Sequence, residues 1–204
     1  MKFLNILLAV LMIITSVYAF SSCGSEPSPA LDDVKDDFCF LIEASAEINE
    51  YFFGAGLPVY DRDDEANAEL YANLASQYSK YEYVSTDSKY ITIEDMKRAA
   101  EKVYTEEYLS SVYMMAFDGY ADEISGVTVA RYLESEGWLF QSTAYEPLIE
   151  GKREFDYNTM KIVKPSRGDY VNVEIVSILD GKELPITLAF SKTADGWRLD
   201  TPTY

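Results

Sequence analysis

The chain contains no histidine and only two cysteines among its 204 residues. Imidazole is the usual base of nucleophilic triads, a common zinc ligand and the side chain that titrates near neutral pH. Its absence therefore excludes Ser-His-Asp and Cys-His catalysis, the commonest zinc sites and a histidine pH switch. The chemistry that remains is carboxylate catalysis, calcium binding or no catalysis at all.

Positive charge is also scarce. The chain has 17 Lys and Arg residues against 35 Asp and Glu residues, which gives a formal net charge of -18 and a pI near 4.3. Such a surface repels phosphate backbones, so we expect no nucleic-acid partner. Against these shortages stand a hydrophobic content of 48% and an aromatic content of 14%, which suffice for the core of one globular domain.

The N-terminal segment combines a basic start with a long apolar stretch. Lys2 precedes an apolar run over residues 3–14, and small residues then lead to Cys23 and Gly24. This order is typical of an export signal. Small residues directly before a cysteine, with glycine after it, resemble the lipobox of bacterial lipoproteins. The resemblance implies a signal peptide over residues 1–22; an ordinary secretory signal and an uncleaved membrane anchor are the alternatives.

In lipoproteins the lipobox cysteine is diacylated on its sulfur and becomes the new N-terminus. Two acyl chains, at about 0.8 kcal/mol per buried methylene, hold a domain firmly to a bilayer. We therefore expect residues 23–29 to form the lipidated Cys23 and a short linker, followed by a single domain over residues 30–204. The expected location is the extracytoplasmic face of the cell membrane, with the lipid bilayer as one partner.

Acylation of Cys23 leaves Cys39 without a disulfide partner. Cys39 belongs to a segment, residues 30–53, in which apolar residues recur every three or four positions. This spacing predicts an amphipathic helix with an acidic, solvated side. Cys39 lies on its apolar side, which favours a small core residue over a reactive thiol.

The first predicted helix ends at Gly54, and further helices are indicated by their starts. The acidic residues 61–65 complement the positive end of a helix dipole, and a short helix is expected to follow them. Thr92 and Thr105 are the expected N-caps of two more helices. The helical half of the chain is expected to end near Gly119.

From there the apolar period changes to two, which is typical of strands. A short strand is already indicated at residues 81–84, and Glu136-Gly137 and Asp180-Gly181 are hairpin turns between alternating segments. Another turn is indicated at residues 194–196. Helices followed by an antiparallel meander predict an α+β fold, with the N-terminal helices packed on one face of a curved antiparallel sheet.

Asp61, Asp63 and Glu65 have the alternate spacing of a calcium-binding loop. That loop also needs a glycine and a bidentate glutamate, and the corresponding residues here are Ala66 and Ala72. A helix N-terminus explains the same acids, so we predict no metal site.

Glu43, Glu47 and Glu50 could supply paired carboxylates for glycoside hydrolysis, but their spacing is that of a solvated helix face. The Arg-Gly-Asp tripeptide at residues 167–169 matches an adhesion motif, and between two strands it is explained by turn formation. We therefore predict no catalytic residue and no cofactor, and expect a protein that is not an enzyme.

Seventeen tyrosines favour binding, because tyrosine joins apolar area to a polar tip at low entropic cost. Several segments resemble, in their order and local sequence, the IseA-type D,L-endopeptidase inhibitor family: residues 51–59, 83–87 with 93–97, 103–108 and 196–202. Known members are exported proteins of Gram-positive bacteria that restrain cell-wall peptidases of the Cys-His type. The element order is also similar to the NTF2-like fold, a cone of helices against a curved sheet.

The resemblance implies a membrane-anchored protein that binds and inhibits or regulates a cell-wall (peptidoglycan) D,L-endopeptidase. We expect the loop after the first helix to make the contact. Its candidate residues are Gly54, Gly56, Tyr60 and Asp61.

The alternative is a lipoprotein that binds a small ligand or wall polymer at the open end of the sheet, with no inhibitory role. The aromatic residues expected to line that pocket are Trp138, Phe140 and Tyr170.

Overall fold

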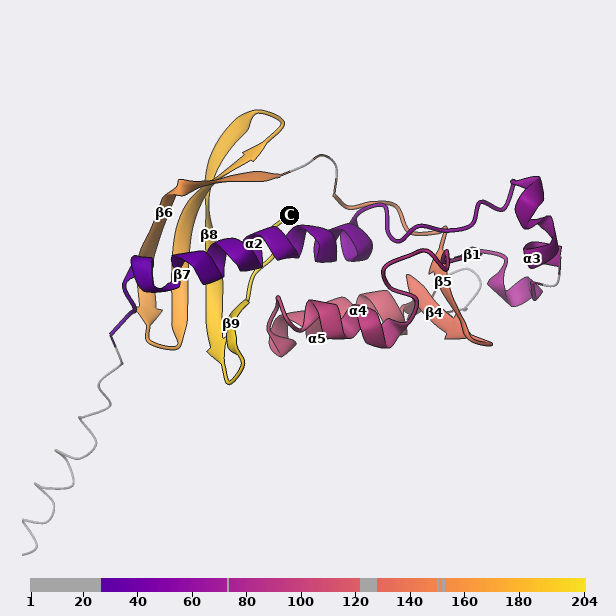
Figure 1. Cartoon of the computed structure of the whole chain (residues 1–204), viewed down its shortest axis with the longest axis horizontal. Coiled ribbons are helices and arrows are strands. Elements are labelled where there is room, and N and C mark those ends of the chain that lie inside the picture. Colours follow the sequence, from indigo (N-terminus) through magenta and orange to yellow (C-terminus); the bar gives the residue numbers. More distant parts are fainter. Residues whose placement is uncertain (1–26, 73, 122–127, 150, 152) are drawn as a thin grey trace, which may run out of the picture.

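A computed structural model describes residues 27–72, 74–121, 128–149, 151 and 153–204. The predicted signal peptide over residues 1–22 and Cys23 lie outside this part of the chain. The described part is elongated, with a long helix at its start and a curved, unclosed antiparallel sheet towards its end (Figure 1). The α+β class predicted from the sequence is confirmed.

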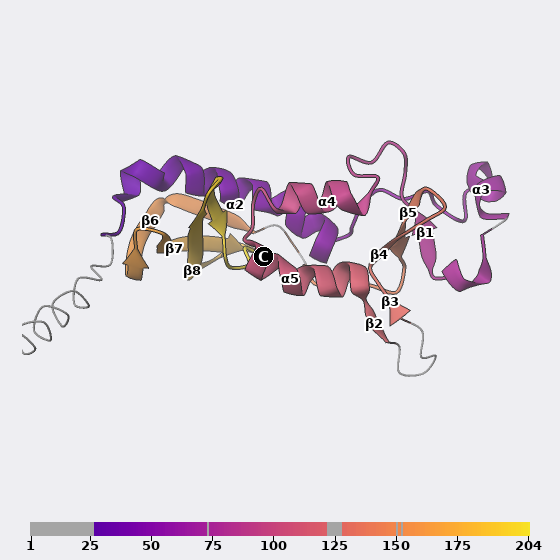
Figure 2. The same ribbon diagram turned by 90° about the horizontal axis from the view of Figure 1, so that it is seen from below.

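The body of the molecule consists of one helix on a four-stranded sheet (Figures 1 and 2). Helix α2 (Leu31–Phe53) lies across one face of strands β6 (Glu154–Arg167), β7 (Tyr170–Leu179), β8 (Lys182–Thr193) and β9 (Gly196–Leu199), which pair in that order. The apolar stripe of α2 faces the sheet because burial of that stripe stabilises the fold.

Phe38 shows how closely the helix and the sheet pack. The Phe38 side chain is fully buried, and its ring stacks on that of Phe190 with ring centres 3.9 Å apart. The Trp197 ring lies nearly perpendicular to the same ring, with ring centres 5.3 Å apart. One aromatic side chain of α2 thus contacts both β8 and β9, and the body core is built around it.

The two hairpin turns predicted from the sequence are confirmed. Asp180 and Gly181 join β7 to β8, and both have positive φ angles, 51° and 74°. Glu136 and Gly137 join β4 (Tyr132–Ser135) to β5 (Trp138–Ser142) with φ angles of 51° and 83°. Two consecutive positive φ angles match the right-handed twist of the strands, which is why glycine is favoured in these turns.

A second sheet lies at the opposite end of the molecule (Figure 1). Strands β1 (Tyr81–Tyr83), β5 (Trp138–Ser142) and β4 (Tyr132–Ser135) pair in that order, and β2 (Tyr120–Ala121) pairs only with β3 (Thr128–Val129). The single continuous meander predicted from the sequence is therefore wrong. The β4–β5 hairpin extends β1 instead of β6, so the described strands form three sheets.

Two helices lie between the sheets. Helices α4 (Ile93–Ala100) and α5 (Glu106–Tyr113) begin as predicted, because the Thr92 side chain accepts a hydrogen bond from Asp95 N and the Thr105 side chain accepts one from Tyr108 N. A π-helical turn, Met114–Asp118, continues α5 and ends at Gly119, where the helical half was expected to end.

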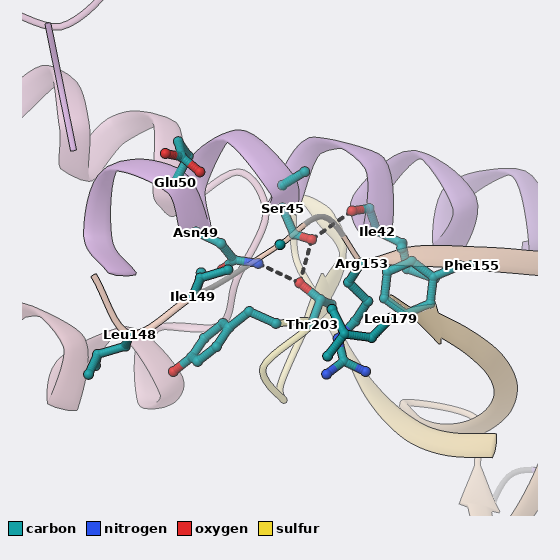
Figure 3. A pocket seen from close by; sticks show the side chains of 13 residues that line it. Ile42, Ser45, Asn49, Glu50, Leu148, Ile149, Arg153, Phe155, Leu179 and Thr203 are labelled. Carbon is teal, nitrogen blue, oxygen red and sulfur yellow. Dashed lines mark hydrogen bonds between the residues drawn. The ribbon is translucent and has the colours of Figure 1, made fainter. Parts of the chain in front are cut away.

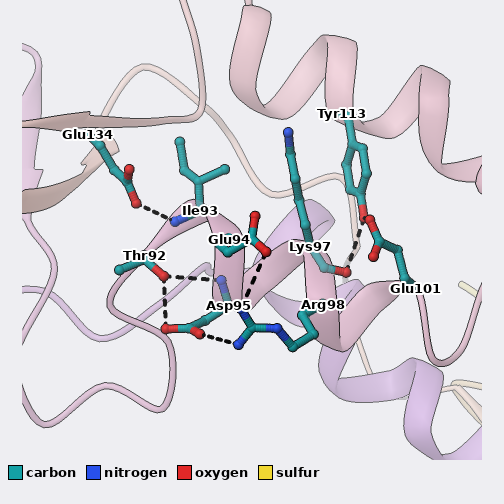
Figure 4. Close-up of polar contacts among 9 residues, drawn as sticks. All are labelled: Thr92, Ile93, Glu94, Asp95, Lys97, Arg98, Glu101, Tyr113 and Glu134. Atoms are coloured by element: carbon teal, nitrogen blue, oxygen red, sulfur yellow. Dashed lines mark hydrogen bonds and ion pairs between the residues drawn. The ribbon is translucent and has the colours of Figure 1, made fainter.

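The sheet of β1, β5 and β4, which we call the small sheet, is connected to α4 by a side chain at the helix start (Figure 4). Ile93 N donates to Glu134 Oε1 of β4 at 2.6 Å, so a carboxylate satisfies one of the free amides of the first turn. On α5, Tyr113 OH donates to Lys97 O of α4 at 3.2 Å. The helical layer and the small sheet are thereby joined through polar contacts as well as packing.

Arg131 joins the small sheet to the end of α2. Its side chain is 3% exposed, and it donates from Nε to Tyr51 O at 2.9 Å and from Nη2 to Gly54 O at 2.6 Å. Tyr132 OH donates to the same Tyr51 O at 2.6 Å. The last carbonyls of a helix lack intrahelical donors and carry partial negative charge. Backbone carbonyl oxygens at the end of α2 therefore stabilise this buried cation.

The segment between α2 and β1 is less regular than predicted. A 3₁₀ turn at Glu65–Asn67, helix α3 (Ala68–Ala72) and a second 3₁₀ turn at Ser76–Tyr78 replace one short helix. Asp64 caps the first turn by accepting from Ala66 N, so the acids do mark a helical start. Across the described ranges, no helix combines the length and the apolar character needed to cross a membrane.

Candidate functional site

The loop after α2 was predicted to contact a partner, and two of its predicted contact residues are glycines that shape its backbone. Gly54 is buried, and a Cβ at this position would lie 2.6 Å from Glu50 Oε2. Gly56 has a φ angle of +96° and lies against the Gln141 side chain, so a larger residue there would be strained. These glycines position the loop and offer no side chain to a partner.

Gln141 holds this loop in one conformation. Leu57 N donates to Gln141 Oε1 at 2.6 Å, and Gln141 Nε2 donates to Ala55 O at 3.2 Å. The amide side chain thus bonds the backbone of the loop on both sides of Gly56, much as a neighbouring strand would. The loop is consequently fixed against β5 in the absence of any partner.

Tyr60 and Asp61 present side chains at the far end of the loop. Tyr60 is half-buried against Trp138, with ring centres 6.5 Å apart, and its hydroxyl lies 2.7 Å from Thr86 Oγ1. Hydrogen bonds from the side chain and backbone of Thr86 lower the pKa of Tyr60. Asp61 is exposed, and its Oδ1 accepts from Asp63 N at 2.9 Å. Both residues remain accessible at the molecular surface.

A depression of about 210 Å³ lies beside this loop, and we call it the acidic depression. It is lined by Gly56, Leu57 and Pro58 of the loop, Glu47, Glu50 and Tyr51 of α2, and Asp87, Ser88, Lys89 and Tyr90. Lys89 Nζ lies 2.6 Å from Glu47 Oε2, and this hydrogen bond raises the pKa of Lys89. Among the described residues, Glu50 and Asp87 have no cationic partner, so the depression carries uncompensated negative charge.

The three aromatic residues predicted to line a ligand pocket do not form one group. Trp138 and Phe140 belong to β5 in the small sheet, whereas Tyr170 begins β7 in the large sheet. Phe140 is buried between Tyr78 and Tyr83, at ring-centre distances of 5.4 and 4.6 Å. The prediction of a shared pocket is wrong because it assumed one continuous sheet.

A larger pocket of about 470 Å³ lies at one side of α2, and we call it the α2 pocket (Figure 3). Its lining comes from α2, the residues before β6, the start of β6, the end of β7 and the last residues of the chain: Ile42, Ser45, Ala46, Asn49, Glu50, Leu148, Ile149, Gly151, Arg153, Phe155, Leu179, Thr203 and Tyr204. Sequence reasoning missed this pocket, because its walls are far apart in the sequence.

A buried polar network forms one wall of the α2 pocket. Ser45 Oγ lies 2.6 Å from Thr203 Oγ1, and Asn49 Nδ2 donates to Thr203 Oγ1 at 2.7 Å. Tyr104 OH donates to Asn49 Oδ1 at 2.8 Å, and burial raises the pKa of Tyr104 to about 12. Ser45 and Asn49 interrupt the apolar side of α2. Two polar residues on that side are the sequence signal that could have indicated a polar site.

The remaining candidate motifs have structural explanations. Arg167 Nε pairs with Asp169 Oδ1 at 2.9 Å within the turn that joins β6 to β7. Cys39 is half-buried against the body core, and burial raises the pKa of its thiol, which disfavours the reactive thiolate. Within the ranges that the structure describes, no three His, Cys, Asp or Glu side chains gather as a metal site.

Comparison with known proteins gives no relative from which a function could be transferred. No protein-family model matches the chain, and no curated protein matches it either. The site therefore rests on its own geometry, and the similarity to IseA-type inhibitors stays a proposal.

Proposed function

We propose that this protein is a non-enzymatic regulator, lipid-anchored on the extracytoplasmic face of the cell membrane, that binds and restrains a cell-wall D,L-endopeptidase. The single observation that supports this proposal is the acidic depression, because it lies beside residues 51–59, the end of α2 and the loop after it. Residues 51–59 are one of the segments that resemble the IseA-type family.

The loop is suited to binding because it is already ordered. A segment that is fixed before association loses little conformational entropy when a partner arrives. Gln141 supplies this order through its two bonds to the loop backbone. The contact surface would combine this loop with Tyr60 and with the carboxylates of Glu50 and Asp87.

Charge defines the partner that fits such a surface. Two carboxylates without cationic partners are complementary to basic residues beside the active-site cleft of a hydrolase. The chain has a net charge of -18, and complementary charge of this kind accelerates association and orients the encounter. Association should therefore slow as ionic strength rises.

The proposal is tested by a wall-digestion assay with a purified Cys-His D,L-endopeptidase and the full-length protein in detergent micelles. The double variant Glu50→Gln, Asp87→Asn removes two charges and keeps similar side-chain shapes. We expect the concentration of this variant that gives half-maximal inhibition to be at least about tenfold higher than that of the wild type. The reason is that a hydrogen bond to a charged group contributes about 1.5–3 kcal/mol.

The matched control is the double variant Asp36→Asn, Asp37→Asn, which removes the same charge from an exposed part of α2 away from the depression. An equal loss in both variants would show that only overall charge matters. Full hydrolase activity at a saturating amount of the wild-type protein would reject the inhibitor proposal.

The lipid anchor has its own test. Cells that express the full-length chain are labelled with a palmitate analogue, and we expect the label on the wild type and none on Cys23→Ser. Cys39→Ser should keep the label, because only Cys23 follows a lipobox-like sequence. A wild type without label, or a Cys23→Ser variant that retains it, contradicts acylation at this residue.

A further inference from the structure

The α2 pocket has apolar walls and an apolar mouth. Leu148 is 68% exposed and Tyr204 is 38% exposed, and both line the opening. Ile42, Phe155 and Leu179 contribute the deeper apolar surface (Figure 3). A volume of about 470 Å³ is within the range of small-molecule sites. Exposed apolar side chains at its opening mark a surface whose burial by a ligand is energetically favourable.

The pocket is held open by the backbone. Leu148 N and Ile149 N both donate to Phe53 O at the end of α2, at 2.8 and 3.2 Å. The Phe53 ring lies 4.3 Å from that of Tyr204, centre to centre. Three parts of the chain are thus fixed around one cavity, so a ligand would enter a site that already exists.

Arg153 gives the pocket one cationic group. Its Nη1 donates to Ser177 Oγ at 2.7 Å, and Ser177 is 1% exposed. Its Nε is buried and has no hydrogen-bond partner. Among the described residues, Nη2 also has no acceptor and no carboxylate lies within ion-pair distance of the guanidinium. The Nε–Nη2 edge, which binds carboxylates with two parallel hydrogen bonds, is left open.

An arginine in this state is unusual. A buried N–H without an acceptor costs free energy comparable to a lost hydrogen bond. Arg131 in the same molecule is the ordinary case, because its Nε and Nη2 both donate to backbone carbonyl oxygens. Arg153 is held by Ser177 on one side and lacks an acceptor on the other, and an anion in the pocket would supply it.

The polar wall provides a second donor. Asn49 is 5% exposed; its Oδ1 accepts from Tyr104 OH and one Nδ2 hydrogen goes to Thr203 Oγ1. An amide nitrogen carries two hydrogens, and no acceptor for the second is present among the described residues. Because Thr203 and Tyr104 fix the orientation of this amide, the second N–H is a positioned donor on the same pocket lining as Arg153.

We propose that the α2 pocket binds a small amphipathic carboxylate, such as a medium-chain fatty acid. The carboxylate would lie on the Nε–Nη2 edge of Arg153, and the apolar chain would cover Ile42, Phe155 and Leu179 and leave past Leu148. A carboxylate fits better than a phosphate because the chain is strongly acidic and the exposed Glu50 lies at the rim of the pocket. A single negative charge is therefore repelled least.

The test uses the full-length protein in a neutral detergent and two probes, decanoate and 1-decanol, followed by titration calorimetry. We expect decanoate to bind more tightly than decanol to the wild type. Arg153→Gln should weaken decanoate binding about 10- to 100-fold, as expected for loss of hydrogen bonds to a charged group, and should leave decanol binding unchanged. Arg167→Gln, on an exposed turn, is the matched control and should bind decanoate like the wild type.

Arg153→Lys covers the case in which the glutamine variant does not fold. Lysine keeps the positive charge but lacks the two parallel N–H donors of the guanidinium. The affinity of this variant for decanoate should therefore lie between those of the wild type and Arg153→Gln. Equal affinity for decanoate and decanol in the wild type would overturn the proposal. So would an unchanged decanoate affinity in Arg153→Gln and Arg153→Lys, or tighter binding of decyl phosphate than of decanoate.

Discussion

The two ends of the molecule are held together in different ways. In the body, β7 and β8 pair without interruption from Tyr170 to Leu179, and α2 covers the sheet with apolar side chains. At the other end β1 has three residues, and the packing is aromatic. We call this part the aromatic end; its members are Tyr60, Tyr71, Tyr78, Tyr81, Tyr83, Trp138 and Phe140.

Hydroxyl groups replace part of the missing strand pairing at the aromatic end. Tyr81 OH donates to Ala130 O at 3.0 Å, and Ala130 N donates to Tyr81 OH at 3.2 Å. Tyr71 OH donates to Tyr60 O at 2.6 Å and accepts from Tyr83 N at 3.2 Å. Where strands are too short to pair fully, a tyrosine can satisfy backbone groups and fill the core with one side chain.

The largest expected effects come from cutting a cavity into each end. Phe38→Ala in the body should lower the free energy of unfolding by about 3–5 kcal/mol and weaken hydrogen-exchange protection throughout the chain. Phe140→Ala removes the same side chain from the aromatic end, and we expect protection to fall in β1 and β5 while β7 and β8 keep theirs. If β7 and β8 lose as much protection as β1 in Phe140→Ala, the two ends form one cooperative unit and the contrast fails.

Arg131 is where the two ends meet, and its removal should separate them. Arg131→Met keeps the apolar stem and leaves Gly54 O without a donor, which costs about 1–3 kcal/mol for a buried carbonyl. We expect the chemical denaturation curve to broaden or to split into two transitions. Arg98→Met is the matched control, because the ion pairs of Arg98 on α4 are exposed and such pairs contribute about 0–1 kcal/mol. A sharp single transition in Arg131→Met would show that the joint lies elsewhere.

The body and the two helices between the sheets were largely predictable from the sequence, because their elements follow local rules. The stripe of α2, the caps at Thr92 and Thr105 and the Asp180-Gly181 turn are each specified by residues within a few positions of one another. Periodicity and capping act over that distance, so a pattern along the chain is sufficient to find them.

The aromatic end and the α2 pocket were not predictable, because their contacts join residues that are far apart in the sequence. β1 pairs with β5, so Tyr83 lies opposite Phe140, and nothing near Tyr83 in the sequence specifies that partner. Ser45 meets Thr203 across 158 positions of the chain. Such contacts depend on the tertiary arrangement. The local sequence pattern is similar around any of the 17 tyrosines, so it does not identify a distant partner.

A single hydroxyl tests how much the tyrosine bonds contribute. Tyr71→Phe keeps the ring and removes the bonds to Tyr60 O and Tyr83 N, so we expect a loss of about 1 kcal/mol. Tyr157, in β6 of the body, is half-buried and has no hydroxyl partner among the described residues. Tyr157→Phe should therefore leave the denaturation midpoint nearly unchanged. Equal effects of the two substitutions would remove the proposed difference between the ends.

The smallest expected effect is a pH dependence confined to the aromatic end. Burial raises the pKa of Glu82 in β1, and Asp61 and Asp63 add to the rise while Arg62 opposes it. The folded protein then holds this proton more tightly than the unfolded chain does. Stability from Glu82 is therefore present at pH values below the unfolded pKa of about 4.3 and is lost as the pH rises through the higher folded pKa.

Replacing Glu82 with glutamine removes that loss, so Glu82→Gln should raise the thermal midpoint at pH 7. The gain should shrink as the pH falls and vanish below about pH 4, where the wild-type carboxyl is also neutral in both states. Glu69→Gln, on exposed α3 at the same end, removes an equal charge and is the control. A gain of equal size at pH 7 and below pH 4 would mean that side-chain shape, and not the cost of ionising a half-buried acid, determines the effect. Ionisation is the stronger explanation, because burial disfavours the charged form of Glu82 more than Arg62 favours it, and Asp61 and Asp63 add to the rise of its pKa.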